Sequence, residues 1–335
     1  MCGFKRPNLA TRQANTMNFN KPVSKLLVLD ESPLHMDTIK RFCDEHNLVG
    51  VKVRKSRLLS VLRANIDLGA ILLDENYGGS LDESAAIANR VYAVRPELPI
   101  IMRRESRATL DDLPDSLRQI LCAAFVASDM APLREVIDRY IFSLDYPNAL
   151  VRGISEISET MLATLFKEFT IDCETPSIVR DRIIFGEVFS LIALESAWCR
   201  GYMMIQAEEE PLLALLDQRG TGGGAADFRD LNDLLGELTN MIWGAFKNRY
   251  LGDADTLARA QVQVPLLVNH RQKYISFGSE NPQLCFVYRI TDEASGRSVD
   301  LHQRFVFSLS WSPEDFREIA EQPGTTVEAG ELDLF

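Results

Sequence analysis

Two polar side chains that could act together, Glu237 and Asn240, lie three residues apart in the otherwise apolar segment 233–248. A spacing of three brings side chains to the same face of a helix, so both are predicted to project from one rigid element. An amide can orient a water molecule by accepting one hydrogen bond and donating another, and a carboxylate can pair with a cation. Together they suit attack by water on a phosphoryl group whose charge a metal ion already neutralises.

The segment that carries this pair is predicted to be an amphipathic helix. Its apolar residues recur at helical spacing and form a wide stripe that we expect to be buried. These residues are Leu234, Leu235, Leu238, Met241, Ile242, Ala245 and Phe246. Gly236 and Gly244 lack side chains and leave the surface beside the pair open to another backbone. The alternative for Glu237 and Asn240 is an exposed polar edge without function.

The sequence around the pair resembles the active helix of the chemotaxis phosphatase family that includes CheX, CheC and FliY. That family carries Gly-Glu-x-x-Asn-Met/Ile-x-x-Gly, and residues 236–244 read Gly-Glu-Leu-Thr-Asn-Met-Ile-Trp-Gly. The resemblance covers about residues 147–312 and includes an alternating run at 258–264 followed by Pro265. It implies a phosphatase that hydrolyses the aspartyl phosphate of a CheY-like partner response regulator. In that reading Asn240 orients the water and Glu237 binds a Lys of the partner.

Length, composition and charge exclude several other classes of protein. The 335 residues suffice for about two domains, each with its own core. A net charge of −12 argues against binding to nucleic acid or to anionic membranes. Six scattered cysteines without C-x-x-C spacing predict reduced core thiols. Because neither a signal peptide nor an apolar membrane span is recognisable, we expect a cytoplasmic protein.

Residues 22–146 are predicted to form a doubly wound, five-stranded parallel sheet, because apolar runs alternate there with helical segments. The expected strands are 25–30, 49–53, 68–74, 98–102 and 123–127. Functional residues of such a sheet lie at the carboxyl ends of its strands. Asp30 and Glu31 end the first strand and Asp74 ends the third, so we expect three carboxylates to meet in one crevice.

This arrangement resembles the receiver domain of two-component response regulators, which implies that Asp74 is a phosphoacceptor. The residues that would then hold Mg²⁺ are Asp30, Glu31, Asp74 and Asn76. Two positions depart from the family, since Arg104 stands where it has Thr or Ser and Ser128 where it has Lys. Arg103 or Arg104 can replace the missing charge, although a guanidinium is not equivalent to an ammonium. The alternative is a degenerate receiver used for docking or dimerisation.

Residues 147–320 are predicted to form an α+β domain, CheX-like, with helices packed over a largely antiparallel sheet. The expected helices are 150–166, 208–217 and 233–248, and the expected strands are 177–185, 188–195, 201–206, 258–268, 273–278, 284–291 and 299–310. In the last strand His302 alternates with apolar residues and is expected to face solvent. With His35, His46 and His270 likewise isolated, we expect no transition-metal site.

The resemblances also imply cofactors and partners. We expect no intrinsic cofactor; Mg²⁺ belongs to the partner receiver, with at most weak binding in the chain's own receiver-like domain. The partner is a phosphorylated response regulator, and a homodimer is expected through the sheet of the second domain. Two other functions stay open: a non-catalytic two-domain signalling adaptor, and a response regulator in which Asp74 gates a CheX-like output domain.

Both ends of the chain are predicted to be tails. Residues 1–21 form a basic segment, and residues 321–335 are acidic but finish in Glu-Leu-Asp-Leu-Phe. The final pentapeptide resembles the peptide that docks on bacterial sliding clamps, with Glu331 where Gln is usual. The alternative is that Leu332, Leu334 and Phe335 fold back onto the second domain.

Overall fold

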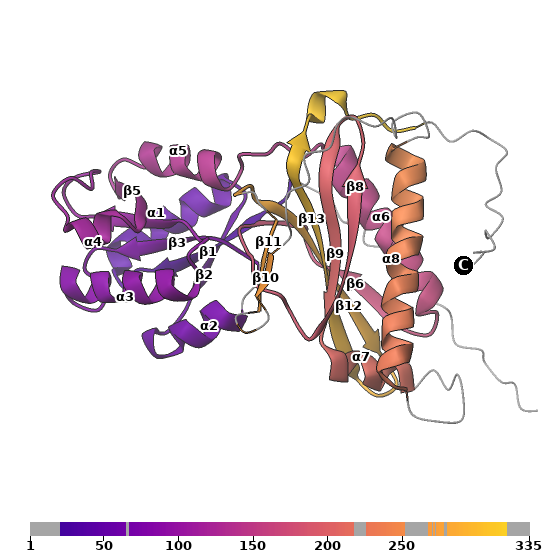
Figure 1. The fold of residues 1–335 in the computed structure, drawn as a ribbon. Coiled ribbons are helices and arrows are strands. Elements are labelled where there is room, and N and C mark those ends of the chain that lie inside the picture. Colours follow the sequence, from indigo (N-terminus) through magenta and orange to yellow (C-terminus); the bar gives the residue numbers. More distant parts are fainter. Residues whose placement is uncertain are drawn as a thin grey trace, which may run out of the picture.

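Two sheets of different kinds organise the chain in the computed structural model (Figure 1). The structure describes residues 21–64, 67–217, 226–251, 267–269, 271, 273–277 and 280–319. A five-stranded parallel sheet comes first, and a six-stranded sheet whose described pairings are all antiparallel follows. This confirms the predicted fold class. The predicted tails apart from Lys21, the strand over 258–264 and His270 lie outside the described residues.

The first unit runs from β1 to α5 and contains the parallel sheet. Its strands, in the spatial order β2-β1-β3-β4-β5, are β1 (Ser24–Leu29), β2 (Leu48–Lys52), β3 (Leu68–Asp74), β4 (Ile100–Arg104) and β5 (Leu121–Val126). All residues of β3 are buried because helices cover both faces of the sheet. The continuous apolar runs in the sequence predicted this placement.

Helices cover the two faces of the parallel sheet unequally. On one face lie α1 (Pro33–Glu45) and α5 (Ala131–Tyr140); on the other lie η1 (Lys55–Arg57), α2 (Leu58–Ala64), α3 (Leu81–Val94) and α4 (Asp115–Arg118). Proline in the first turn of α1 and a Ser80 hydroxyl that accepts from the Glu83 amide at α3 favour the observed helix starts. The short helix α4 was not predicted, because four residues show no helical period.

The second unit runs from α6 to η5 and packs three helices on one face of the antiparallel sheet. Its strands, in the order β6-β12-β13-β9-β8 with β7 beside β12, are β6 (Thr170–Cys173), β7 (Ser177–Val179), β8 (Val188–Glu195), β9 (Cys199–Ala207), β12 (Gln283–Asp292) and β13 (Arg297–Trp311). The helices are α6 (Asn148–Leu165), α7 (Glu209–Leu216), α8 (Phe228–Tyr250) and the short η5 (Pro313–Asp315) at the end of the described chain. A ribbon of β10 (Leu267–Asn269) and β11 (Tyr274–Ser276) lies on the opposite face.

Two strand predictions for this unit need correction. The expected strand over 177–185 is a strand only at Ser177–Val179, because the chain then turns to bury Asp181 between the units. Strand β6 was not predicted, since four residues with mixed polarity give little alternation.

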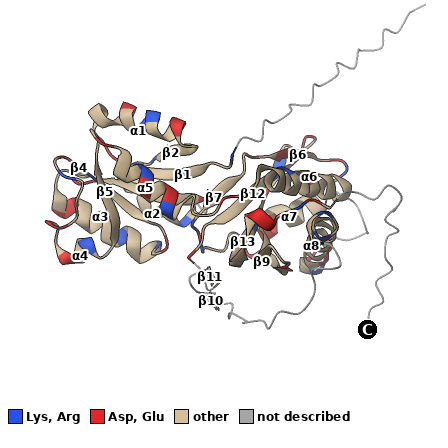
Figure 2. Ribbon diagram, turned by 90° about the horizontal axis from the view of Figure 1, so that it is seen from above, with Lys and Arg blue, Asp and Glu red and all other residues tan. Residues whose placement is uncertain are grey.

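Backbone hydrogen bonds through β7 join the two sheets (Figure 2). β7 pairs with β12, and its residue Ile178 also donates to the carbonyl of Val23 at 2.8 Å, just before β1. The amide of Arg180 donates to the carbonyl of Leu68 at the start of β3. These contacts lie at the amino ends of the parallel strands. The carboxyl ends, which carry Asp30 and Asp74, therefore point away from the second unit.

The antiparallel sheet separates the first unit from α8. Phe286 and Phe305 point into the core beneath the helices, whereas neighbouring residues in the same strands point to the other face. The first unit covers part of that other face, and Figure 1 shows it across the sheet from α8. His302 lies on this covered face with 8% exposure, so the prediction that it faces solvent is wrong. The alternation of apolar and polar residues separated the two faces of β13 correctly. It could not show that the first unit covers the face on which His302 lies.

Candidate functional site

Helix α8 is a firmly anchored element. Asp227 caps its first turn by accepting from the amides of Arg229 and Asp230, while the Asp230 carboxylate accepts from the Asp227 amide at 2.8 Å. Its apolar stripe is buried against α6, α7 and β8, which confirms the helix predicted over 233–248. A helix held at its cap and along one face offers its exposed residues in fixed positions.

Glu237 and Asn240 are both exposed on the outer face of α8. The bare glycine positions beside them are open, because a Cβ added at Gly236 or Gly244 meets no described heavy atom within 4 Å. A partner backbone can thus approach the helix at both positions. The structure places the acid and the amide together, as their spacing predicts, on a surface suited to docking.

A hydroxyl that sequence reasoning passed over fixes the helix directly behind this pair. Thr239 is buried; its Oγ1 donates to the carbonyl of Leu235 at 2.7 Å and lies 2.5 Å from Oγ of Ser190 on β8. This contact restricts rotation of α8 about its axis. A hydroxyl residue within an apolar helical stripe was the available signal, because a buried hydroxyl needs a partner.

The neighbouring helix α6 offers no comparable pair. Glu156 accepts from Nη1 of Arg249 at 2.9 Å and so belongs to an ion pair between α6 and α8. Glu159 is half-buried, and burial raises the pKa of its carboxyl, as does the nearby Glu156. Glu156 is thus engaged between the two helices, whereas Glu159 interacts with the Cys173 thiol of β6.

The predicted acidic crevice contains a guanidinium. Asp30 and Asp74 lie at the carboxyl ends of β1 and β3, and Arg103 of β4 reaches both of them. Its Nε donates to Asp30 at 2.6 Å and its Nη2 lies 2.7 Å from Asp74, while Nη1 donates to Glu105 at 2.7 Å. Arg103 is 1% exposed. A residue of the chain itself therefore balances part of the negative charge of the crevice.

Protonation equilibria in the crevice reflect this packing. Burial raises the pKa of the Asp74 carboxyl, and the Asn76 amide and Arg103 oppose that shift. Burial alone would lower the pKa of Arg103, but its hydrogen bonds to Asp30 and Glu105 outweigh burial and raise it. The guanidinium thus keeps its charge inside the crevice.

The remaining residues predicted for this site are arranged differently. Glu31 and Asn76 are exposed, and the backbone amide of Asn76 donates to Asp74 at 3.2 Å. Arg104 points elsewhere: it forms two hydrogen bonds to Asp112, at 2.8 and 2.9 Å, and one to Glu75. The sequence left open whether Arg103 or Arg104 takes the place of the lysine that receiver domains carry. Arg103 is the arginine that contacts Asp30 and Asp74.

Carboxylate oxygens are the ligands that Mg²⁺ prefers, but their arrangement here counts against such a site. Arg103 lies between Asp30 and Asp74, and within the described ranges no group of three His, Cys, Asp or Glu side chains is placed to hold a metal ion. A Mg²⁺ site formed by the predicted residues stays a prediction. In the part of the chain that the structure describes, no helix is long and apolar enough to cross a membrane.

Comparison with solved structures finds partial likenesses to chemotaxis proteins. A CheC-like chemotactic protein from Shewanella oneidensis is 18% identical over 45% of this chain and 94% of its own, with a TM-score of 0.32. CheX from Vibrio vulnificus is 17% identical over 46% of this chain and 96% of its own, with a TM-score of 0.29. The CheX–CheY–BeF₃–Mg²⁺ complex from Borrelia burgdorferi gives 14% identity, coverages of 46% and 95%, and a TM-score of 0.27.

Likenesses at this level do not assign the chain to a family. No family model matches the sequence, and no curated protein does either.

Proposed function

We propose that this protein is a phosphatase that hydrolyses the aspartyl phosphate of a separate response regulator in two-component or chemotaxis signalling. One observation carries the proposal: Glu237 and Asn240 are exposed together on a fixed helix, beside glycine positions that a partner backbone can approach. The motif around them, noted above for its resemblance to the chemotaxis phosphatases, adds support from the sequence.

The chemistry assigns a distinct role to each residue. The amide of Asn240 accepts a hydrogen bond from a water molecule and holds it in line with the phosphorus atom. The water oxygen forms a new bond to phosphorus as the bond to the aspartyl oxygen breaks, which releases inorganic phosphate and the carboxylate. Glu237 pairs with a Lys of the partner and so fixes the register of the two proteins. Mg²⁺ bound by the partner stabilises the charge on the phosphoryl oxygens.

The geometry supports a target on another molecule. Asp74 lies at the end of the parallel sheet that faces away from the second unit, and α8 lies on the far side of the antiparallel sheet (Figure 1). Asn240 cannot reach the carboxylate of Asp74 within one chain in this arrangement. Arg103 also occupies the position beside Asp74.

Loss of phosphate from purified receivers tests the proposal directly. Asn240→Ala is expected to slow the discharge of a phosphorylated partner by about a hundredfold, the scale for removing one positioning group. Glu237→Ala is expected to raise the partner concentration needed for half-maximal rate. Asn248→Ala, an exposed amide two turns further along α8, is the matched control and should leave the rate unchanged. Equal rates for Asn240→Ala and the wild type would refute the catalytic role.

A non-catalytic signalling adaptor is the second candidate, and the Arg103 contacts favour it. A first unit that carries its own cation has no need of phosphorylation to hold its shape, as expected for a docking module. The two candidates differ in one measurement. An adaptor would bind a partner receiver through α8 without changing the lifetime of its phosphate.

Location and assembly complete the proposal. We place the protein in the cytoplasm, where response regulators act, and we expect a homodimer through the sheet of the second unit. Strand β8 ends the described strand order of that sheet, and an edge strand has unpaired backbone groups that a second copy can pair with. Light scattering of the full chain tests this, and a monomer at high concentration would rule it out.

A further inference from the structure

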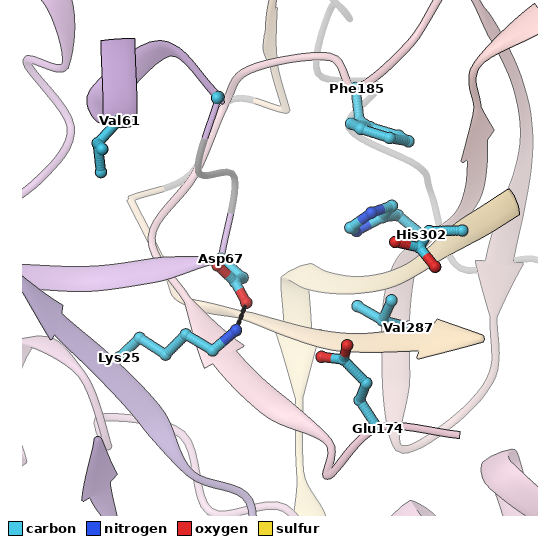
Figure 3. Close-up of a pocket in the computed structure, with 9 residues that line it drawn as sticks. Lys25, Val61, Asp67, Glu174, Phe185, Val287 and His302 are labelled. Carbon is cyan, nitrogen blue, oxygen red and sulfur yellow. Dashed lines mark hydrogen bonds and ion pairs between the residues drawn. The ribbon is translucent and has the colours of Figure 1, made fainter. Parts of the chain in front are cut away.

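A cleft of about 410 Å³ lies between the two units, away from both α8 and the acidic crevice (Figure 3). The first unit contributes Lys25 of β1, Asp67 before β3 and two residues of α2. The second unit contributes side chains from the face of its sheet opposite the helices, among them Glu174 and His302. The volume lies within the range of clefts that bind small molecules.

His302 is a buried polar residue that projects into this cleft, and Asp67 of the first unit is another (Figure 3). Its imidazole packs against Phe185 with ring centroids 4.2 Å apart, and the residue is 8% exposed. Burial, helped by Arg304, lowers the pKa of His302 to about 4, so the ring is neutral at pH 7. Its Nδ1 is buried and has no hydrogen-bond partner among the described residues. In the tautomer that carries its proton on Nε2, Nδ1 is an acceptor that a ligand N–H can satisfy.

The charges around the cleft favour a cationic ligand. Asp67, Glu174 and Asp300 contribute carboxylates, whereas Lys25 is the one cation among the lining residues, and it pairs with Asp67. Behind the lining, Arg289 donates twice to Asp300, at 2.8 Å each, and lies 4.0 Å from Glu174. The three lining carboxylates outnumber Lys25 and Arg289 together, and Arg304, the cation that lowers the pKa of His302, is paired with the buried Asp181. An anionic ligand would be repelled.

Part of the cleft is lined by apolar side chains. Val61 of α2 faces Val287 of β12 across it, and the ring of Phe185 covers one end (Figure 3). A ligand that fits must therefore combine a positively charged donor with a short hydrocarbon or aromatic body.

We propose that the cleft binds a small organic cation with a primary ammonium or guanidinium group. Its N–H groups donate to His302, and its charge faces Glu174, the carboxylate that Arg289 approaches least closely. Its apolar part lies along Val287 and Phe185. Because the walls come from both units, such a ligand binds best when the units hold this relative position, and it stabilises that position in return.

Calorimetric titration of the full-length protein tests this, with agmatine and putrescine as cationic probes and succinate as the anionic probe. We expect saturable binding of at least one amine with a Kd below about 1 mM and none of succinate. Glu174→Gln keeps the shape of the wall and should weaken amine binding about tenfold or more, the scale for a hydrogen bond to a charged group. His302→Phe should also weaken it, while retaining a ring against Phe185.

A matched control separates the cleft from general charge effects. Glu314→Gln removes an exposed carboxylate of η5 outside the cleft and should leave amine binding unchanged. The proposal is overturned if neither amine gives saturable heat up to about 10 mM, if Glu174→Gln binds as tightly as the wild type, or if succinate binds as well as the amines. Glu174 is exposed, so its substitution is not expected to impair folding. None of these outcomes depends on phosphatase activity.

Discussion

The guanidinium of Arg103 lies 2.7 Å from the carboxylate of Asp74 at the carboxyl end of the parallel sheet. The same group donates to Asp30 at 2.6 Å, so one side chain contacts both buried acids. The crevice thus contains the guanidinium of Arg103 at the place where the sequence predicts a bound Mg²⁺ ion.

Replacing Arg103 with Ser should make the first unit sensitive to Mg²⁺. Loss of the guanidinium leaves Asp30 and Asp74 buried and unneutralised, which is expected to destabilise the protein by about 3 kcal/mol or more. Millimolar Mg²⁺ should restore part of this stability, because a cation that binds only the folded state stabilises it. Thermal unfolding with and without Mg²⁺ measures both effects.

The control for this experiment is Arg118→Ser, which breaks an exposed ion pair with Asp115. It should change the melting temperature little and confer no response to Mg²⁺. A wild-type protein that Mg²⁺ already stabilises would contradict the inference that Arg103 fills the crevice.

His302 should make the stability of the protein depend on pH between 4 and 6.5. Burial and Arg304 lower its pKa from 6.5 to about 4, so the unfolded chain takes up the proton first as the pH falls. The stability is complete above pH 6.5 and declines toward pH 4, by roughly 3 kcal/mol at most. Its other charged neighbours, Asp300, Asp67 and Lys25, act in opposing directions.

Urea unfolding at several pH values isolates the contribution of this histidine. His302→Phe keeps the ring contact with Phe185 but cannot bind a proton, so its stability should fall less between pH 6.5 and 4 than that of the wild type. His35→Phe is a useful control, because His35 lies at the crevice end of the first unit, 3.8 Å from Glu105. Parallel pH profiles for His302→Phe and the wild type would show that the buried ring does not govern this range.

Thr239 and Ser190 should be energetically coupled. Thr239→Val removes a hydroxyl that bonds both Leu235 and Ser190, and we expect a loss of about 1–2 kcal/mol. Ser190→Ala in the Thr239→Val background should cost little more, since its partner is already gone. A double-mutant cycle by urea unfolding measures the coupling.

The same substitution should affect the proposed reaction through position alone. Thr239→Val should slow receiver discharge about three- to tenfold without changing the partner concentration at half-maximal rate, because α8 is less firmly oriented. Thr160→Val on α6 removes an equivalent bond, from Thr160 to the carbonyl of Glu156, and is the matched control. If both threonine variants behave alike, the contact with β8 does not position the site.

Asp181 should determine whether the two units unfold together. Its buried carboxylate lies 3.2 Å from Arg95 of the first unit and 3.0 Å from Arg304 of the second. Asp181→Asn removes the carboxylate that Arg95 and Arg304 share, at a cost of about 3 kcal/mol, while Arg95 keeps its ion pair with Glu97. Differential scanning calorimetry should show one transition for the wild type and two for the variant.

The exposed residue Asp172 of β6 provides the comparison for Asp181. Asp172→Asn should preserve a single transition and nearly the wild-type melting temperature. Two transitions in the wild type would mean that the units already unfold independently.

Local patterns predicted most elements; the errors are elements too short to show a period, such as α4 and β6, and environments set by contacts between distant segments. The apolar run before Asp30 predicts strand β1, and the helical spacing of the apolar residues around Leu238 predicts helix α8. The environment of His302 depends on which domain covers its sheet face, and no neighbouring residue encodes that. The contact of Arg103 with Asp74 could not be predicted either, because only the fold places β4 beside β3. The Glu237 and Asn240 pair was visible because one helix holds both members.

Because β7 bonds to both sheets, the two halves of the chain are separate in the sequence but share backbone hydrogen bonds in the structure. Val23 belongs to the first half, yet its backbone partners are Pro176 and Ile178 of the second. A recombined gene that joined residues 147–320 to a different doubly wound domain would have to recreate those bonds, or leave backbone groups unpaired. Each half is thus expected to lose backbone hydrogen bonds, and with them stability, when it is produced without the other.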